Sequence, residues 1–246
     1  MGFRPNRSKI DNIFNVRLKY EKCYEYNIDL HNIFIDFSQT FDTIHRDVIY
    51  NSLIKHNVPD KLKKELMKLK MQRTRMKMKV NNSYSEWFET KTGVREGDPL
   101  STLLFSVVLD SVITNIEVRG NITTRIKQIC ALADDILMIG RTKQILIDTF
   151  CKLKHEALNA GLVVNNNKTK CLYCTRKIFQ LTYLNTGEER FEQVNSFKYL
   201  GSMVNTDNSI EEEIKERIAA GNKAYLAHKK TIQIKINIRK RQTSTL

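Results

Sequence analysis

The chain has 246 residues, of which 41% are hydrophobic, only 3 are proline and 9 are glycine, a composition that fits a globular protein and excludes a disordered one. Its 41 Lys and Arg residues against 27 Asp and Glu residues give a formal net charge of +14. This excess favours a polyanionic partner such as nucleic acid, although ribosomal and membrane-surface proteins share it. No apolar run approaches the roughly 20 residues of a spanning helix, and the N-terminus lacks a secretory segment. We therefore expect an intracellular protein, of the nucleus or cytoplasm, without a membrane partner.

The first third of the chain predicts one strand between helices. Residues 8–26 have helical apolar spacing, and Ser8 with Asp11 suits a capping box. The apolar stretch HNIFIDF at 31–37 predicts a short strand with Asp36 near its end. Two helices should follow, at 46–55 and from Pro59 to residue 72. The many lysines of the second helix fit a solvated face and a phosphate-contacting face equally well.

A basic hairpin is predicted next. Residues 75–80 (RMKMKV) alternate basic and apolar side chains, Asn81-Asn82 suits a turn, and residues 85–91 return. Arg75, Lys77 and Lys79 share one face of this hairpin. That face could lie along a nucleic-acid backbone, although lysines on an exposed strand also prevent edge pairing.

A glycine-punctuated loop, GVREGDP at 93–99, leads into a strongly apolar helix at 100–118. Asp98 is a favourable N-cap residue, and Pro99 suits the first helical position. The helix N-terminus should lie beside Arg95, where backbone N–H groups can bind a phosphate or support a base.

Two adjacent carboxylates, Asp134 and Asp135, interrupt the apolar run at 129–140. Burying two like charges is costly unless a cation neutralises them, so a hairpin that presents both to a divalent metal is one interpretation. An ordinary surface turn is the other, because Asp is common in turns.

The last third should contain a helix at 143–160 that ends at Gly161, and strands at 162–164, 170–175 and 197–200. Ser209 and Glu212 suit a capping box for a helix from residue 210 to about residue 230. The odd number of cysteines, 5, argues against a disulfide framework. Cys171 and Cys174 lack the further ligands that zinc needs, so a strand is the simpler interpretation of this pair.

Taken together, these stretches resemble the reverse transcriptase domain of non-LTR (LINE-type) retrotransposons. FIDFSQTFDTIHRD (34–47) is similar to motif A, GVREGDPLSTLLFSVVLD (93–110) to motif B, and LADDILMIG (132–140) to motif C. GLVVNNNKTK (161–170) resembles motif D, FKYLG (197–201) the motif E primer grip, and GFRPNRSKIDNIF (2–14) the element before motif A.

The resemblance implies an α+β fold, a right-hand polymerase palm in which helices pack on an antiparallel sheet, with partial fingers and a partial thumb. It places the reverse transcriptase domain at residues 1–205 and the start of a truncated thumb at 206–246.

The resemblance also implies an RNA-directed DNA polymerase that uses an RNA template, a DNA primer and deoxynucleoside triphosphates. Such enzymes perform two-metal nucleotidyl transfer onto a primer 3′-hydroxyl. Oxygen ligands suit Mg²⁺, with Mn²⁺ as an alternative. Asp36, Asp134 and Asp135 match the catalytic carboxylates, and the backbone carbonyl of Phe37 matches a further metal ligand.

Further residues match positions that contact substrate. Phe41 would lie under the incoming sugar, where its ring excludes a 2′-hydroxyl. Arg95 and Gly97 would support the template base and the nascent pair, and Lys168 would contact the triphosphate. The nucleic-acid backbone would be held by Arg75, Lys77, Lys79 and Lys198.

Three departures from the family pattern keep an alternative open. Leu132 replaces the usual aromatic residue, Glu96 replaces Gln, and Thr40 replaces Ala. The alternative is a catalytically inactive, truncated remnant that binds nucleic acid. A two-metal nuclease is disfavoured, because a nuclease needs neither motif B nor Phe41.

Overall fold

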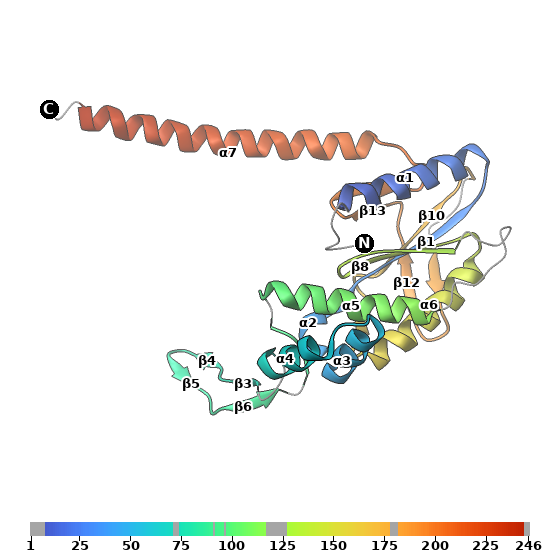
Figure 1. Ribbon diagram of the computed structural model, residues 1–246. Helices are drawn as coiled ribbons and strands as arrows, with labels where there is room; N and C mark the ends of the chain where they lie inside the picture. Colours follow the sequence, from blue (N-terminus) through green and yellow to red (C-terminus); the bar gives the residue numbers. More distant parts are fainter. Residues whose placement is uncertain are drawn as a thin grey trace.

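The computed structural model describes residues 8–70, 74–90, 92–95, 97–116, 127–177 and 182–243. Its centre is a sheet of strand order β11-β12-β10-β1-β8-β7 (Figure 1). The strands are β1 (Leu30–Ile35), β7 (Lys127–Leu132), β8 (Asp135–Gly140), β10 (Lys170–Cys174), β11 (Tyr183–Asn185) and β12 (Arg190–Gln193). Every pair in it is antiparallel except β10 with β12. The predicted antiparallel sheet is therefore confirmed, with one parallel pair added.

Strand β1 pairs with β10 on one edge and β8 on the other, and both of its faces are covered. Ile33 and Ile35 pack into a core with α3 (Arg46–Lys55), α5 (Pro99–Asn115) and α6 (Lys143–Asn159). Phe34 belongs to a second core, formed with α1 (Lys9–Glu25) and with the hairpin of β13 (Ser196–Tyr199) and β14 (Ser202–Asn205). Figure 1 shows these two layers on opposite faces of the sheet. The continuous apolar run of β1 is explained by this double burial.

Local signals predicted most element boundaries. Ser8 and Asp11 form the expected capping box of α1, and the Asp98 side chain accepts a hydrogen bond from the Leu100 backbone N–H at the start of α5. Cys171 and Cys174 lie in β10 and contribute to the two different cores, so they face opposite sides of the sheet. The zinc alternative is thereby excluded for this pair. Residues 2–7, Glu96 and the predicted helix ends at residues 72 and 118 lie outside the described residues.

The predicted basic hairpin is present as two short ladders. Strand β3 (Thr74–Met76) pairs with β6 (Phe88–Thr90), and β4 (Lys79–Val80) pairs with β5 (Ser83–Tyr84). Residues 74–90 are called the arm below. It follows α4 (Asp60–Lys70) and projects from the body of the protein (Figure 1).

The last helix differs from its prediction. Helix α7 begins at Glu211 and continues to Thr243, well beyond residue 230. The expected capping box of Ser209 and Glu212 is wrong. A helix capped by Ser209 would begin at residue 210, but α7 begins at Glu211, and the Glu212 carboxylate accepts a hydrogen bond from the Ser196 hydroxyl instead. Glu213 instead accepts hydrogen bonds from the Met203 backbone N–H and the Ser202 hydroxyl, which ties α7 to β14.

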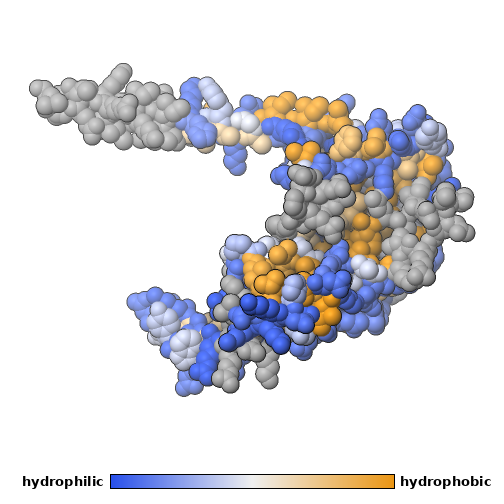
Figure 2. Space-filling view, in the orientation of Figure 1, coloured by the Kyte–Doolittle hydropathy of each residue, from blue (hydrophilic) through white to orange (hydrophobic). Residues whose placement is uncertain are grey.

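Helix α7 and the arm extend on two sides of a hollow that opens beside the sheet, visible in the space-filling view (Figures 1 and 2). Within the described part of the chain, no helix combines the length and the apolar character needed to cross a membrane.

Candidate active site

Asp36 and Asp135 lie at the same end of the central sheet. Ile35, the last residue of β1, pairs with Ile136 of β8, so the next residue on each strand lies just beyond this pair. The backbone around Asp36 is fixed by motif D, because the Asn165 N–H donates to the Asp36 carbonyl at 2.8 Å. The Asp36 N–H donates to the Thr169 hydroxyl at 3.4 Å. Pairing between residues about a hundred positions apart therefore brings the motif A and motif C carboxylates together.

Asp134 lies in the turn between β7 and β8. Leu132 pairs with Asp135, which leaves Ala133 and Asp134 as a two-residue turn with the Asp134 side chain exposed. Ala133 has φ of +53°, a left-handed conformation that costs a residue with a Cβ about 1–2 kcal/mol. The hairpin thus maintains a locally unfavourable backbone at the point where it presents a carboxylate.

The electrostatics of this cluster are those of an anionic site. Partial desolvation, followed by repulsion from Asp134 and Asp36, raises the pKa of Asp135. Lys168, from motif D, places its Nζ 3.7 Å from Oδ2 of Asp36. That oxygen is buried and has no hydrogen-bond partner. The site therefore retains an unmet need for positive charge.

A cavity of about 400 Å³ opens beside these groups. Its polar lining comes from Asp36, Asp135, Asn167, Lys168 and Lys170, and its apolar lining includes Phe34 and the motif E residues Phe197 and Tyr199. The rings of Phe34 and Phe197 stack with centroids 4.3 Å apart, so β13 packs against β1, the strand that leads to Asp36. Asp134 is not among the residues that line this cavity. Lys198 of the same hairpin is paired with Glu216 of α7 at 2.6 Å.

The donor set fits a hard divalent cation in part. In the part of the chain that the structure describes, no group of three His, Cys, Asp or Glu residues is arranged to hold an ion. The buried Oδ2 of Asp36, which has Lys168 at 3.7 Å but no hydrogen-bond partner, and the raised pKa of Asp135 nevertheless indicate a place where a cation would be favourable. Phe37 and Val164 are paired between β2 (Phe37–Ser38) and β9 (Val163–Val164). The Asn165 N–H donates to the carbonyl of Asp36, so Asp36 and Asn165 form a hydrogen-bonded pair and the next pair, Phe37 with Val164, is not hydrogen-bonded. The Phe37 carbonyl therefore points away from β9.

The motif B loop is attached to the short helix α2 (Thr40–Thr43) of motif A. The Val94 N–H donates to the Phe41 carbonyl at 2.7 Å, and the Gly93 N–H donates to the Ile44 carbonyl at 2.8 Å. The Phe41 ring is half-buried, with its centroid 5.7 Å from that of Phe105 in α5. Arg95 and Gly97 are exposed on the same loop. The structure therefore brings Phe41 close to the loop that carries Arg95 and Gly97.

Arg46 holds this loop, a role that no sequence signal indicated. Its guanidinium donates to the backbone carbonyls of Thr90, Thr92 and Gly93 at 2.9, 3.1 and 3.1 Å. Desolvation, and then the neighbouring Arg95, lower the pKa of Arg46. An arginine in the first turn of a helix is too common for its partners to be predicted from sequence alone.

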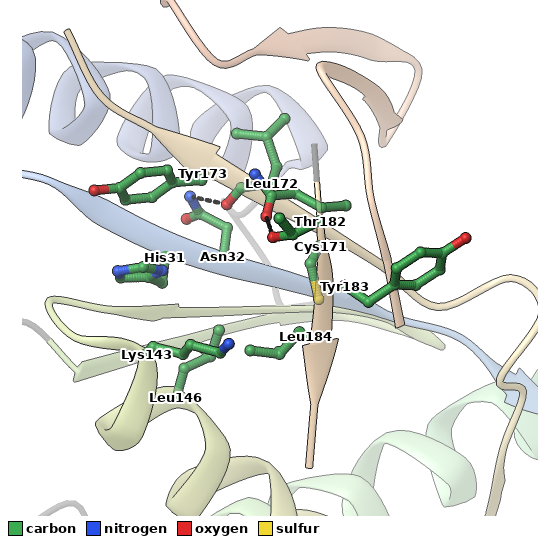
Figure 3. Close-up of a pocket in the computed structure, with 11 residues that line it drawn as sticks. His31, Asn32, Lys143, Leu146, Cys171, Leu172, Tyr173, Thr182, Tyr183 and Leu184 are labelled. Atoms are coloured by element: carbon green, nitrogen blue, oxygen red, sulfur yellow. Dashed lines mark hydrogen bonds between the residues drawn. The ribbon is translucent and has the colours of Figure 1, made fainter. Parts of the chain in front are cut away.

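A second cavity, of about 230 Å³, lies between α6 and strands β1, β10, β11 and β12 (Figure 3). His31 and Tyr173 stack at its edge, with ring centroids 4.5 Å apart. The Asn32 amide donates to the Leu172 carbonyl at 3.1 Å, as the dashed line in Figure 3 shows. None of the predicted site residues lines this cavity, which lies at the opposite end of β1 from Asp36.

Known proteins that resemble the chain belong to one family. The model of the family described as "Reverse transcriptase (RNA-dependent DNA polymerase)" matches residues 1–204. The Pol polyprotein from type-1 retrotransposable element R2 of Nasonia vitripennis is 24% identical over 192 residues, which are 73% of this chain and 19% of that protein. The Pol polyprotein from type-2 retrotransposable element R2DM of Drosophila melanogaster is 25% identical over 214 residues, 81% of this chain and 20% of that protein. The chain thus spans about a fifth of the length of these relatives.

Solved structures show the same fold. Apo telomerase from Candida Tropicalis, truncated from its C-terminal domain, superposes with a TM-score of 0.58 at 16% identity, over 81% of this chain and 39% of that one. Telomerase of the same organism with a TWJ fragment of telomeric RNA gives 0.58 at 17% identity, over 80% and 31%. The expected polymerase palm is therefore confirmed. Because the family match covers all of motifs A to E, the chain belongs to the reverse transcriptase (RNA-dependent DNA polymerase) family, as a domain of the non-LTR retrotransposon type.

Proposed function

We propose that the chain is the catalytic domain of an RNA-directed DNA polymerase that extends a DNA primer along an RNA template with deoxynucleoside triphosphates. The observation that supports this most directly is the meeting of Asp36 and Asp135 at one end of the central sheet, beside the Asp134 turn. A carboxylate cluster next to a lysine is the arrangement that phosphoryl transfer requires, because catalysis there consists of positioning and charge neutralisation.

In this proposal Asp36, Asp134, Asp135 and the Phe37 carbonyl hold divalent cations of the kind the family uses, Mg²⁺ in preference to Mn²⁺. When bound, such ions supply Lewis-acid activation of the primer hydroxyl and neutralise charge on the leaving pyrophosphate. The chain's own contribution is a fixed pair of strand ends and a partly desolvated Asp135, whose raised pKa would fall once positive charge is nearby.

Other residues position the substrates. Lys168 now lies 3.7 Å from Asp36, and its exposed ammonium can turn toward a triphosphate that approaches the same cavity. The Phe41 ring, supported by Phe105, supplies a bulky surface under the sugar and so favours deoxynucleotides. Arg95 and Gly97 support the template base and the nascent pair.

Basic side chains around the hollow bind the phosphate backbones of the template and the primer in this proposal. Arg75, Lys77 and Lys79 belong to the arm, and Lys198 belongs to the β13–β14 hairpin. Lys198 is paired with Glu216 and Arg75 with Glu89, so each must exchange a carboxylate for a phosphate before it can contribute. Lys77 and Lys79 are exposed. Contacts of this kind predict an affinity for nucleic acid that falls steeply with salt.

Primer extension on an RNA template, with Mg²⁺ and then Mn²⁺, tests the proposal. Wild-type protein should extend the primer and Asp134→Ala should not, whereas Asp148→Asn, which alters an exposed carboxylate of α6, should extend normally. Absence of extension by wild type, with salt-sensitive RNA binding retained, would refute the polymerase and leave the nucleic-acid-binding alternative. Shortening of the primer would instead indicate a nuclease.

A further inference from the structure

The arm exposes an unusual amount of apolar surface for so small a unit. Six large side chains in it are at least 41% exposed, namely Met76, Met78, Val80, Tyr84, Trp87 and Phe88. An isolated pair of strands is at best marginally stable in water, and clustered exposed apolar side chains mark a surface that binds a partner. Trp87 is the only tryptophan of the chain, and 62% of it is exposed.

Two lysines lie over the aromatic rings of this surface. The Lys77 Nζ is 4.7 Å from the Trp87 ring centroid and 5.9 Å from that of Tyr84. The Lys79 Nζ is 5.7 Å from the Tyr84 centroid, since these residues lie opposite one another in the β4–β5 ladder. We call these four residues the aromatic–lysine cluster. In Figure 2 the arm is the pale and blue projection at the lower left.

We propose that the aromatic–lysine cluster binds single-stranded nucleic acid by stacking bases on Trp87 and Tyr84. A nucleotide presents a flat base next to an anionic phosphate, and the cluster presents flat rings next to ammonium groups. Rings with interleaved cations are the elements that sequence-tolerant single-strand binding uses. The earlier assignment of Lys77 and Lys79 to backbone contacts concerns charge alone, whereas this inference adds recognition of the bases themselves.

The position of the arm fits this partner. A cavity of about 230 Å³ at its base is lined by Met76 and Thr90 of the arm, by Asp42 and Arg46 of motif A, and by the motif B loop, including Gly93 and Arg95. This cavity lies between the base of the arm, which carries the cluster farther out, and the loop that carries Arg95 and Gly97. A nucleic-acid strand that passes this loop would therefore reach the arm. This path rests on the proposed function, because it assumes that a template lies at the motif B loop. The stacking itself requires neither a metal nor a nucleoside triphosphate.

Fluorescence of Trp87 tests the inference in the unmodified protein. The probes are oligo(dT) of roughly 12 nucleotides, within the span that single-strand binders cover, and an abasic strand of equal length and charge. In the presence of EDTA, oligo(dT) should quench Trp87 and bind more tightly than the abasic strand. Equal binding of the two probes without quenching would overturn stacking.

Variants then locate the effect. Trp87→Ala should weaken oligo(dT) binding by about fivefold or more and remove most of the preference over the abasic strand. Trp87→Phe should retain most of both, which keeps the test decisive if the Ala variant folds poorly. Tyr183→Ala is the matched control, because Tyr183 is also exposed and also lies under a cation, Arg190 at 3.8 Å, but outside the arm.

Salt dependence separates stacking from charge. Lys77→Ala should reduce the slope of log affinity against log salt by roughly one, whereas Trp87→Ala should leave it nearly unchanged. An equal loss in Trp87→Ala and Tyr183→Ala would refute the inference, as would capture of an acidic protein by the arm without any preference for bases. Failure of primer extension with retained quenching would refute the polymerase alone.

Discussion

Gly93 connects the motif A helix to the motif B loop, and its replacement by Ala should damage both. Its φ is +79°, and an added Cβ would lie 2.7 Å from the Asp42 carbonyl oxygen and 2.8 Å from that of Phe41. The left-handed backbone alone costs an alanine about 1–2 kcal/mol. Moving away from the two carbonyls would break the Gly93–Ile44 and Val94–Phe41 hydrogen bonds, about 0.5–1.5 kcal/mol each. We therefore expect Gly93→Ala to lower the free energy of unfolding by about 2–5 kcal/mol.

Replacement of two other glycines distinguishes the cost of the left-handed backbone from the cost of the close contact with α2. Gly97 has φ of +81° and Gly187 has φ of +96°, and neither would place a Cβ within 4 Å of another atom. Gly97→Ala and Gly187→Ala should each cost only the conformational term, about 1–2 kcal/mol. Urea unfolding followed by circular dichroism gives all three values under the same conditions. A loss in Gly93→Ala no larger than in the two controls would refute the reasoning, because the contact with α2 would then contribute nothing.

Three further predictions concern charge and shape. Asp134→Asn removes repulsion that raises the pKa of Asp135, and a raised carboxyl pKa destabilises the fold above the unfolded value near 3.9. The unfolding free energy of the Asp134→Asn variant at neutral pH should therefore rise by about a few tenths of a kcal/mol, and this gain should disappear below about pH 4. The variant should also lose primer extension. A lower stability than wild type at neutral pH would contradict this reasoning. Phe41→Ala should admit ribonucleotides in a comparison of both nucleotide types, and unchanged sugar selection in an active enzyme would remove its assignment. Desolvation alone would raise the pKa of Glu213, but hydrogen bonds from Met203, Arg217 and Ser202 outweigh it and lower the pKa. The ionised Glu213 therefore stabilises the fold above its unfolded pKa near 4.3, and this stabilisation is lost as the pH falls. Glu213→Gln should thus cost about 1–3 kcal/mol at pH 7 and less near pH 3, by urea unfolding; a pH-independent difference would contradict this.

Several elements could be predicted because their signals are local. The capping box of Ser8 and Asp11, the N-cap at Asp98 and the end of α6 at Gly161 each depend on residues within one helical turn. Helix α7 was predicted too short, because its last turns alternate basic and apolar residues, a pattern without helical spacing. No strand was predicted at β11, since its three residues are too few to show alternation.

The tight turn that carries Asp134 just before Asp135 was identifiable from sequence alone, as were its flanking strands and the order of motifs around it. Those features follow from short-range propensities and from residue spacing that any folded state must accommodate. Sequence could not tell which carboxylate shares a cavity with Asp36, and the structure places Asp135, not Asp134, in that lining. It also could not reveal that Arg46 holds the motif B loop or that Lys77 lies over Trp87. These relations depend on strand register and on the packing of residues far apart in the chain, where a shift of one position reverses every side chain.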